Sequence, residues 1–388
     1  MALGNLFRNK NAGLHAVLDI GSSLIRVVIF EPTGKNTATS PRVVKKLAVS
    51  LPAGGEKLGN SPGDKLRVVQ KLHEVLMQMI KELGATPERI IVGVGPNLAD
   101  FSVTEWSAPL SGKRRLTMRD LSASFAALLE KERKPDHSLL AYPLGVLANG
   151  YPVSDVALAR ELDTRMIATL GFPVLLAEFP TNVGEELGVI ERTLGGLRIE
   201  FLPVLRAYED MILRVLKIRD TLMIDIGSAH TLVMLMQNGT LTRTVTFPSG
   251  VSYFVERLVE ASSVPLAQAA DELRRYGDHA VDEATEIRLH NMMEREARNW
   301  RDELISALDA FYTAGPLPAS VILAGGGAYF PEIRAILAAG EWLTGFSNEK
   351  KPVLRVVEGR TLFEGDSLQG SLLGPEECAL ASYMIYLQ

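Results

Sequence analysis

The stretch AVLDIGSSLIRVVIF, residues 16–30, breaks a strand-like apolar run with a Gly-Ser-Ser corner just after an aspartate and an isoleucine. About two hundred residues later, the stretch LMIDIGSAHTLVMLM, residues 222–236, repeats this arrangement. The two segments align without gaps, so that Asp19 falls opposite Asp225. An Asn238-Gly239 pair follows the second segment and is a strong signal for a β-hairpin. The chain is therefore predicted to contain a duplicated unit.

The composition of the two corners points to phosphate binding. Glycine and small hydroxyl residues between antiparallel strands let backbone N–H groups and serine hydroxyls approach a phosphate chain closely. An aspartate at the end of the strand is placed to hold a hydrated magnesium ion. Two such hairpins facing each other could clamp a triphosphate.

A third glycine-rich segment is a candidate for nucleoside binding. In LAGGGAYFPEI, residues 323–333, Gly325, Gly326 and Gly327 follow an apolar strand and precede a helix that starts at Pro331. Glycine backbone lets a purine or a ribose lie flat against the chain. Any one of these corners alone would be a weak signal, but three in this order predict a nucleotide site.

Bulk composition narrows the class of protein. The chain has 388 residues, 47% hydrophobic and 22% charged, with a net charge of -5, which argues against nucleic acid as the main partner. The single cysteine, Cys378, is predicted to be core and fits a reducing cytoplasm. The six histidines are scattered, which predicts no transition-metal site. No apolar run approaches the roughly 20 residues of a membrane-spanning helix.

The N-terminal segment has two open interpretations. Leu3, Leu6 and Phe7 fall at helical spacing beside Arg8 and Lys10, so residues 1–10 are either a short interfacial membrane anchor or a frayed terminus.

Local patterns predict the elements between the motifs. An amphipathic helix is expected over residues 64–83, with Asp64 as its N-cap. Thr117 followed by Asp120 indicates a second helix start. The alternation of strands and this helix over about ninety residues predicts a small subdomain inserted into the first half.

These motifs resemble those of the actin-like ATPase superfamily, whose phosphate-1, phosphate-2 and adenosine motifs look like the three glycine corners. The inserted region is similar to that of the FtsA and PilM branch, on the stretch TMRDLSASFAALLEKERKPDHSLLAYPLGVLANGYPVSDV at residues 117–156. Further similarity lies in FLPVLRAYEDMIL, NGTLTRTVTFPSG, ADELRRYG and GPEECALASYMIYL, so that the resemblance covers nearly the whole chain.

The resemblance implies an α/β actin-like ATPase fold, with two duplicated RNase H-like halves around a nucleotide cleft and a small inserted α+β subdomain of the SHS2 type. The implied divisions are 1–88 and 166–220 for the first half, 89–165 for the insertion, 221–372 for the second half with a helical part at 251–318, and 373–388 for a closing helix.

The resemblance also implies site residues. ATP and Mg²⁺ would be contacted through the phosphates by Asp19, Gly21, Ser22 and Ser23, with Arg26 where relatives place a lysine. The second phosphate hairpin would comprise Asp225, Gly227 and Ser228, with both aspartates holding Mg²⁺ through water. The nucleoside would lie on Gly325, Gly326 and Gly327, near Asp271 and Arg274.

Two departures from the family predict weak hydrolysis. The second acid of the phosphate-2 motif is replaced by Leu232, and the position of the glutamate that orients water in several relatives is Leu202, with Glu200 two residues before it. Loss of a water-orienting group lowers the rate of hydrolysis and leaves binding intact. His230 is a candidate substitute, although a histidine in a turn is more often structural.

Three functions are compatible with this sequence. The first is an FtsA-like, ATP-binding scaffold at the inner membrane face that recruits a tubulin-like division protein. The second is a PilM-like cytoplasmic platform of a type IV pilus or secretion complex, which binds a pilus inner-membrane protein. The third is an active sugar or acetate kinase, for which no acid stands in a persuasive context. Self-association into filaments or dimers stays open.

Overall fold

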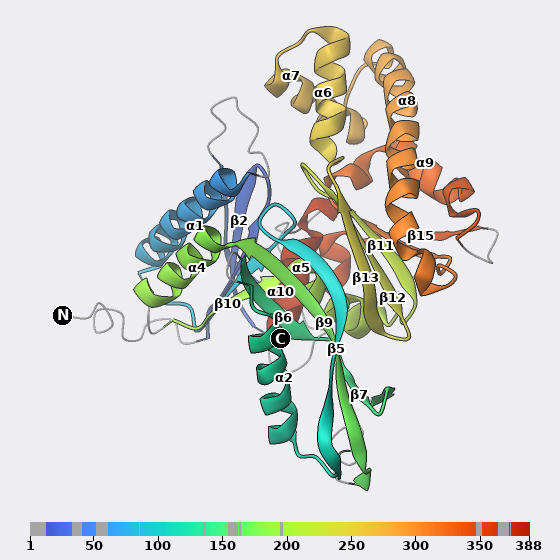
Figure 1. Cartoon of the computed structure of the whole chain (residues 1–388). Helices are drawn as coiled ribbons and strands as arrows, with labels where there is room; N and C mark the ends of the chain where they lie inside the picture. The colour runs from blue at the N-terminus through green and yellow to red at the C-terminus, as the bar shows by residue number, and fades with distance from the viewer. Residues whose placement is uncertain are drawn as a thin grey trace.

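A computed structural model describes residues 13–32, 41–51, 61–84, 86–134, 137–153, 162, 164–194, 197–346, 351–363, 372 and 374–388. Two α/β halves lie side by side, and a smaller unit projects from the first half (Figure 1). The predicted interfacial segment at residues 1–10 lies outside the described residues.

The first half is built on a five-stranded sheet in the order β3-β2-β1-β4-β10. Its strands are β1 (His15–Ile20), β2 (Leu24–Glu31), β3 (Arg42–Ser50), β4 (Arg89–Val94) and β10 (Ile199–Pro203). Both faces of β1 are buried because Ala16 and Leu18 pack on one side and Val17 on the other. Helices α1 (Pro62–Leu83) and α4 (Thr181–Thr193) cover the first of these faces.

The N-terminus of α1 differs slightly from the prediction. Ser61 is the N-cap, and its hydroxyl accepts a hydrogen bond from the backbone N–H of Asp64. Asp64 lies in the first turn instead, where its negative charge favours the helix dipole. Pro62 at the first helical position fits this start, since proline lacks the N–H that would be left unpaired there.

The second half repeats the sheet of the first. Its order is β13-β12-β11-β14-β15, and the pairings run antiparallel, antiparallel, parallel and parallel, as in β3-β2-β1-β4-β10. Its strands are β11 (Thr221–Ile226), β12 (Thr231–Gln237), β13 (Thr240–Phe247), β14 (Ser320–Ala324) and β15 (Val353–Val356). The duplication and the Asn238-Gly239 hairpin are confirmed.

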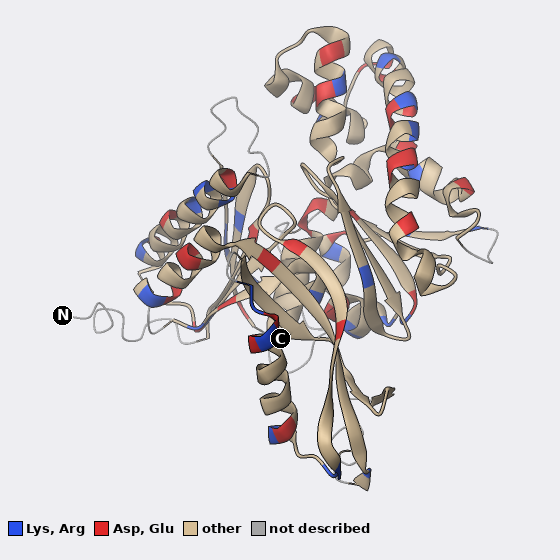
Figure 2. Ribbon diagram, viewed as in Figure 1, with Lys and Arg blue, Asp and Glu red and all other residues tan. Residues whose placement is uncertain are grey.

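Helices cover the second sheet and extend beyond it. They are α6 (Val251–Ser262), α7 (Leu266–Gly277), α8 (Glu283–Leu308) and α9 (Pro331–Ala339). Short 3-10 turns lie at Asp309–Ala314, Gly326–Tyr329, Glu341–Leu343, Gly359–Leu362 and Pro375–Glu377. Acidic and basic side chains alternate along α8 (Figure 2) and include an Arg298–Glu294 pair one turn apart.

In the described part of the chain, the smaller unit comprises a third sheet and helix α2. It comprises β5 (Asp100–Arg114), β6 (His137–Pro143), β7 (Val146–Ala148), β8 (Tyr151–Val153), β9 (Ile167–Pro180) and α2 (Met118–Glu132). Thr117 and Asp120 form the expected capping box at the start of α2.

The strand pairings of this unit differ from the expected limits of the insertion, 89–165. Residues 89–94 form β4, which pairs with β1 and β10 of the first sheet. Residues 167–180 form β9, which pairs with β5 and β6 of the third sheet. By sheet membership the insertion therefore begins near residue 100 and ends near residue 180.

Two helices lie between the large sheets. One is α5 (Val204–Asp210), which follows β10 and continues as a π-helical turn over Met211–Leu216. The other is α10 (Cys378–Leu387), which packs against α5 and against Val17 of β1 in one apolar core. Cys378 is buried there, as predicted. Among the described helices, none is both long and apolar enough to cross a membrane.

Candidate nucleotide site

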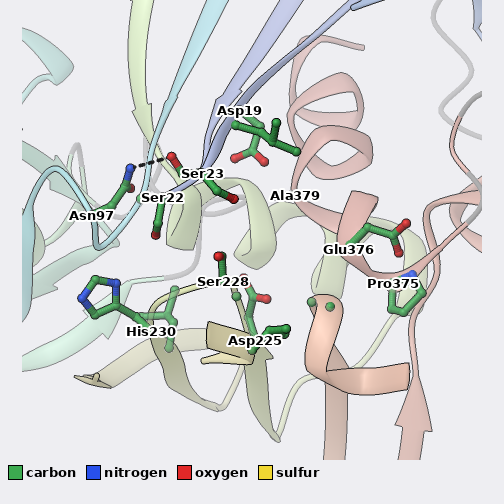
Figure 3. Close-up of a pocket in the computed structure, with 18 of the residues that line it drawn as sticks. Asp19, Ser22, Ser23, Asn97, Asp225, Ser228, His230, Pro375, Glu376 and Ala379 are labelled. Atoms are coloured by element: carbon green, nitrogen blue, oxygen red, sulfur yellow. Dashed lines mark hydrogen bonds between the residues drawn. The ribbon is translucent and has the colours of Figure 1, made fainter. Parts of the chain in front are cut away.

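A cavity of about 650 Å³ lies between the two halves (Figure 3). Most of the residues predicted to bind nucleotide line it: Asp19, Gly21, Ser22, Ser23, Arg26, Asp225, Gly227, Ser228, Arg274, Gly325 and Gly326. Segments separated by up to three hundred residues thus converge on one space.

The two hairpins meet this cavity with the same local geometry. The Gly21 N–H donates to the Leu24 carbonyl at 2.9 Å, and the Gly227 N–H donates to the His230 carbonyl at 2.9 Å. In the strand register Asp19 lies opposite Arg26, and Asp225 lies opposite Leu232. The second hairpin therefore carries an apolar residue where the first carries a cation.

Asp225 is held by a tyrosine from the other half. The Tyr208 hydroxyl, on α5, donates to Oδ2 of Asp225 at 2.6 Å. Burial raises the pKa of Asp225 to about 6, against the lowering effect of this hydrogen bond and with a further increase from nearby Asp19. Burial also raises the pKa of Asp19, while the Arg26 guanidinium opposes that shift.

Arg26 connects the first hairpin to the C-terminal segment. Its Nη1 lies 3.4 Å from Oδ2 of Asp19 and donates to the Glu376 carbonyl at 3.2 Å. Its side chain is 24% exposed, so the guanidinium borders the cavity.

Gly325 is required by its surroundings. Its φ is +82°, and a Cβ there would lie 2.3 Å from Oδ1 of Asp225 and 2.4 Å from the Ile226 carbonyl. Its N–H donates to the Pro375 carbonyl at 2.9 Å. Gly327 is also closely packed, since its Cβ would lie 2.3 Å from Cγ2 of Ile226, but it does not line the cavity.

The predicted nucleoside residues on α7 are only partly at the cavity. Arg274 lines it, and its guanidinium pairs with Asp271 at 2.8 Å and with Asp278 at 3.4 Å. Asp271 does not line the cavity, whereas Asp278 does. Both ion pairs lie in solvent, since the Arg274 side chain is 66% exposed.

His230 lines the cavity at its edge, and its ring points away from Asp225 (Figure 3). Burial lowers the pKa of His230, positive Lys65 lowers it further, and Asp100 opposes these effects. The imidazole is therefore neutral at pH 7.

The residues at and near the expected water-orienting position, Leu202 and Glu200, do not line the cavity. Leu202 is fully buried in the core. Glu200 accepts hydrogen bonds from Tyr386 at 2.9 Å and Arg89 at 3.3 Å, and it does not line the cavity. The carboxylates that line the cavity are those of Asp19, Asp225, Asp278 and Glu376.

Sequence reasoning missed Tyr208, Asn97, Asp278 and Glu376. The Asn97 amide donates to the Gly21 carbonyl at 3.1 Å and holds the first corner (Figure 3). Topology could have found it: β4 is the parallel neighbour of β1, so residues after both strands meet at one sheet edge. For Tyr208 no local signal exists, because its role depends on the other half.

The donor set fits magnesium and phosphate. Among the described residues, no three His, Cys, Asp or Glu side chains are close enough to hold a metal by themselves. Two carboxylates and nearby serine hydroxyls offer oxygen donors, which suit an ion that retains water and shares phosphate oxygens. Gly21, Gly227 and Gly326 line the cavity and carry no side chain that would keep a phosphate chain from the backbone.

Comparisons with known proteins bear on the fold. No family model and no curated protein matches the sequence. Among solved structures, the PilM-PilN type IV pilus biogenesis complex is similar with a TM-score of 0.60 and 16% identity, over 96% of this chain and 98% of that chain. The ethanolamine utilization protein EutJ from Carboxydothermus hydrogenoformans has a TM-score of 0.47 and 13% identity, over 99% and 93%. MreB 5 of Spiroplasma citri bound to AMPPNP has a TM-score of 0.47 and 9% identity, and the match covers 97% of this chain and 96% of that chain.

At sequence identities this low, structural similarity shows a shared fold and nothing about function. The fold is nonetheless specific, because it combines two sheets of the same strand order, a cavity between them and two helices, α5 and α10, that pack together and contribute to the cavity wall. The chain has the actin-like ATPase fold.

Proposed function

We propose that this protein binds ATP with Mg²⁺ in the cavity between its halves and acts as a scaffold whose conformation depends on the nucleotide. One observation carries the proposal: two hairpins with the same turn and an aspartate at the same register position border one cavity.

The lining residues have distinct roles in this proposal. Ser22, Ser23 and Ser228 donate hydrogen bonds to phosphate oxygens, while the N–H groups of Gly21 and Gly227 keep the two turns closed. Arg26 neutralises phosphate charge. Asp19 and Asp225 orient the water molecules of Mg²⁺, which supplies charge neutralisation when bound. Gly325 and Gly326 support the nucleoside, with Arg274 and Asp278 at its edge.

Slow hydrolysis is part of the proposal. Attack on a phosphoanhydride needs a positioned water molecule and stabilised charge. Slow hydrolysis is supported by the burial of Leu202 in the core, by the position of Glu200 outside the cavity and by the His230 ring, which is turned away from Asp225. Binding without rapid turnover suits a conformational switch more than an enzyme.

The partner that we propose is a peptide from an inner-membrane protein of a pilus or secretion complex, which this protein would bind at the cytoplasmic face. Support comes from the similarity to the PilM-PilN complex over 96% of this chain. The third sheet and α2 project away from both large sheets and offer a surface for such a peptide (Figure 1). Recruitment of a tubulin-like division protein is the alternative that the test must separate.

Nucleotide binding is tested by thermal unfolding and calorimetry. Wild-type protein should gain stability with Mg-ATP, by about 2.7 kcal/mol at a hundredfold excess over Kd. Asp19→Ala should reduce this gain. Equal unfolding with and without Mg-ATP would contradict the proposal.

The scaffold role is tested by measuring the binding of candidate partner peptides and the rate of phosphate transfer. The peptide arm uses a cytoplasmic peptide of a pilus inner-membrane protein, and the second arm uses the C-terminal tail of the tubulin-like protein. Binding to the tail alone would favour the division role. Rapid phosphate transfer that depends on a sugar or acetate would overturn the scaffold proposal.

A further inference from the structure

Two tyrosines occupy equivalent positions on the helices between the halves. Leu205-Arg206-Ala207-Tyr208 on α5 aligns with Leu380-Ala381-Ser382-Tyr383 on α10. Each helix follows the last strand of its half, and the two pack against each other in one core. The duplication of the sheets thus extends to these helices.

The first tyrosine, Tyr208, makes a hydrogen bond from one half of the protein to the other. Tyr208 belongs to the first half, yet its hydroxyl donates to Asp225 of the second half at 2.6 Å. It therefore fixes the carboxylate of the second phosphate hairpin across the boundary between the halves.

The second tyrosine lies beside the first hairpin. Gly93 is the register partner of Asp19 on the neighbouring strand, and a Cβ on Gly93 would lie 2.3 Å from the Tyr383 hydroxyl oxygen. Register partners on adjacent strands direct their side chains to the same face, with Cβ atoms about 5 Å apart. The hydroxyl hence occupies the space next to the Asp19 side chain.

The two positions differ in their hydrogen bonds. The Tyr383 side chain is fully buried, and its hydroxyl has no hydrogen-bond partner among the described residues. Asp19 is paired with Arg26 instead, at 3.4 Å. An unpaired buried hydroxyl costs free energy, so a state that gives it an acceptor is favoured.

We propose that Tyr383 is a positioning residue of the nucleotide site, whose hydroxyl donates to Asp19 when Arg26 turns from Asp19 to the bound phosphates. The liganded site then has two matched pairs, Tyr208 with Asp225 and Tyr383 with Asp19. Each pair joins a hairpin to the helix of the other half. This inference rests on the proposed nucleotide binding.

The test compares Tyr383→Phe with Tyr386→Phe. The Tyr386 hydroxyl lies on the same helix and donates to Glu200 at 2.9 Å, outside the cavity, so it is a matched control. Thermal unfolding without ligand and calorimetric Kd values for Mg-ATP are measured for both variants.

The expected results have opposite patterns. Tyr383→Phe should leave the ligand-free Tm unchanged or higher, because it removes an unpaired hydroxyl, and should raise the Kd about tenfold or more, because a hydrogen bond to a charged group is lost. Tyr386→Phe should lower the Tm and leave the Kd unchanged. A wild-type Kd in Tyr383→Phe would overturn the inference, and absence of Mg-ATP binding by the wild type would overturn the proposed function with it.

A second measurement needs no nucleotide. In an Arg26→Ala background Asp19 has lost its cation, so the Tyr383 hydroxyl should donate to it already. Tyr383→Phe should then lower the Tm in that background but not in the wild type. Equal effects in both backgrounds would contradict the inference even where nucleotide binding is observed.

Discussion

Asp225 lies at the end of a buried strand, where lost hydration raises its pKa to about 6 from 3.8. The folded protein therefore binds a proton at this carboxyl between about pH 4 and pH 6, where the unfolded chain has released it. The contribution to stability is full below pH 4 and is lost as the pH rises through 6. A difference of about two pKa units corresponds to roughly 3 kcal/mol.

This shift gives a pH prediction for Asp225→Asn. The neutral amide still accepts the Tyr208 hydrogen bond and never becomes charged. The variant should match the wild type at pH 4 and exceed its unfolding free energy by up to about 3 kcal/mol at pH 7. Urea denaturation at both pH values measures this difference. Parallel pH profiles for the two proteins would show that the carboxylate is not destabilised by burial.

The close packing around Gly325 gives a prediction with an internal control. Gly325 has φ and ψ of 82° and 171°, and Gly315 has 85° and -168°, so both lie in a backbone region that favours glycine. Only at Gly325 would a Cβ meet other atoms, since nothing lies within 4 Å of one at Gly315.

We expect Gly315→Ala to cost about 1–3 kcal/mol of stability through backbone strain alone. Gly325→Ala should cost clearly more and should abolish Mg-ATP binding, because the methyl group displaces the Asp225 carboxylate. Urea denaturation and calorimetry measure both effects. Equal costs for the two variants would mean that the contact with Asp225 relaxes freely.

At the scale of elements, the sequence predicted correctly those features that depend on a few adjacent residues. The Asn238-Gly239 turn, the Thr117 cap and the twin Asp-x-Gly corners each depend on a few neighbouring residues, and each is present in the fold. β4 was assigned to the wrong sheet because its partner β1 lies seventy residues away and its apolar sequence suits any buried strand.

The residues of the candidate site were likewise predictable only where they belong to a local motif. The glycine corners line one cavity, and their binding of nucleotide stays a prediction, whereas the contacts of Tyr208 and Asn97 join segments that are distant in the sequence. The glycines of the triplet lie in different environments, although their sequence context is the same. Gly325 borders the cavity, and Gly327 packs on Ile226. Composition alone does not distinguish such positions.

The capping box of α2 gives a prediction for the inserted unit. The Thr117 hydroxyl accepts from the backbone N–H of Asp120, and the Asp120 carboxylate accepts from the N–H of Thr117. Thr117→Ala should destabilise α2 by about 1 kcal/mol and speed the hydrogen exchange of its amides. Ser122→Ala is the control, because that hydroxyl donates to the Met118 carbonyl inside the helix and its loss should not increase exchange. Mg-ATP affinity should stay unchanged in both, since α2 does not border the cavity.

At the scale of the molecule, one ligand would contact both halves. The first hairpin and the second lie on opposite sides of the cavity, and α5 with α10 forms the packed connection beneath. A phosphate chain bound to Ser22 and Ser228 together adds contacts that favour a narrower cleft. Closure of this kind moves rigid halves about a few hinge positions.

Spin labels can measure that closure. The single natural cysteine, Cys378, is buried, so introduced surface cysteines should be labelled selectively. Met77 on α1 and Ile287 on α8 are exposed, at 43% and 57%, and lie in different halves (Figure 1). Mg-ATP should shorten the distance between labels on Met77→Cys and Ile287→Cys, while a pair on Leu266→Cys and Ile287→Cys, both in the second half, should keep its distance. If calorimetry shows the site saturated and the first distance is unchanged, nucleotide binds without moving the halves, and a conformational scaffold is the wrong description of this protein.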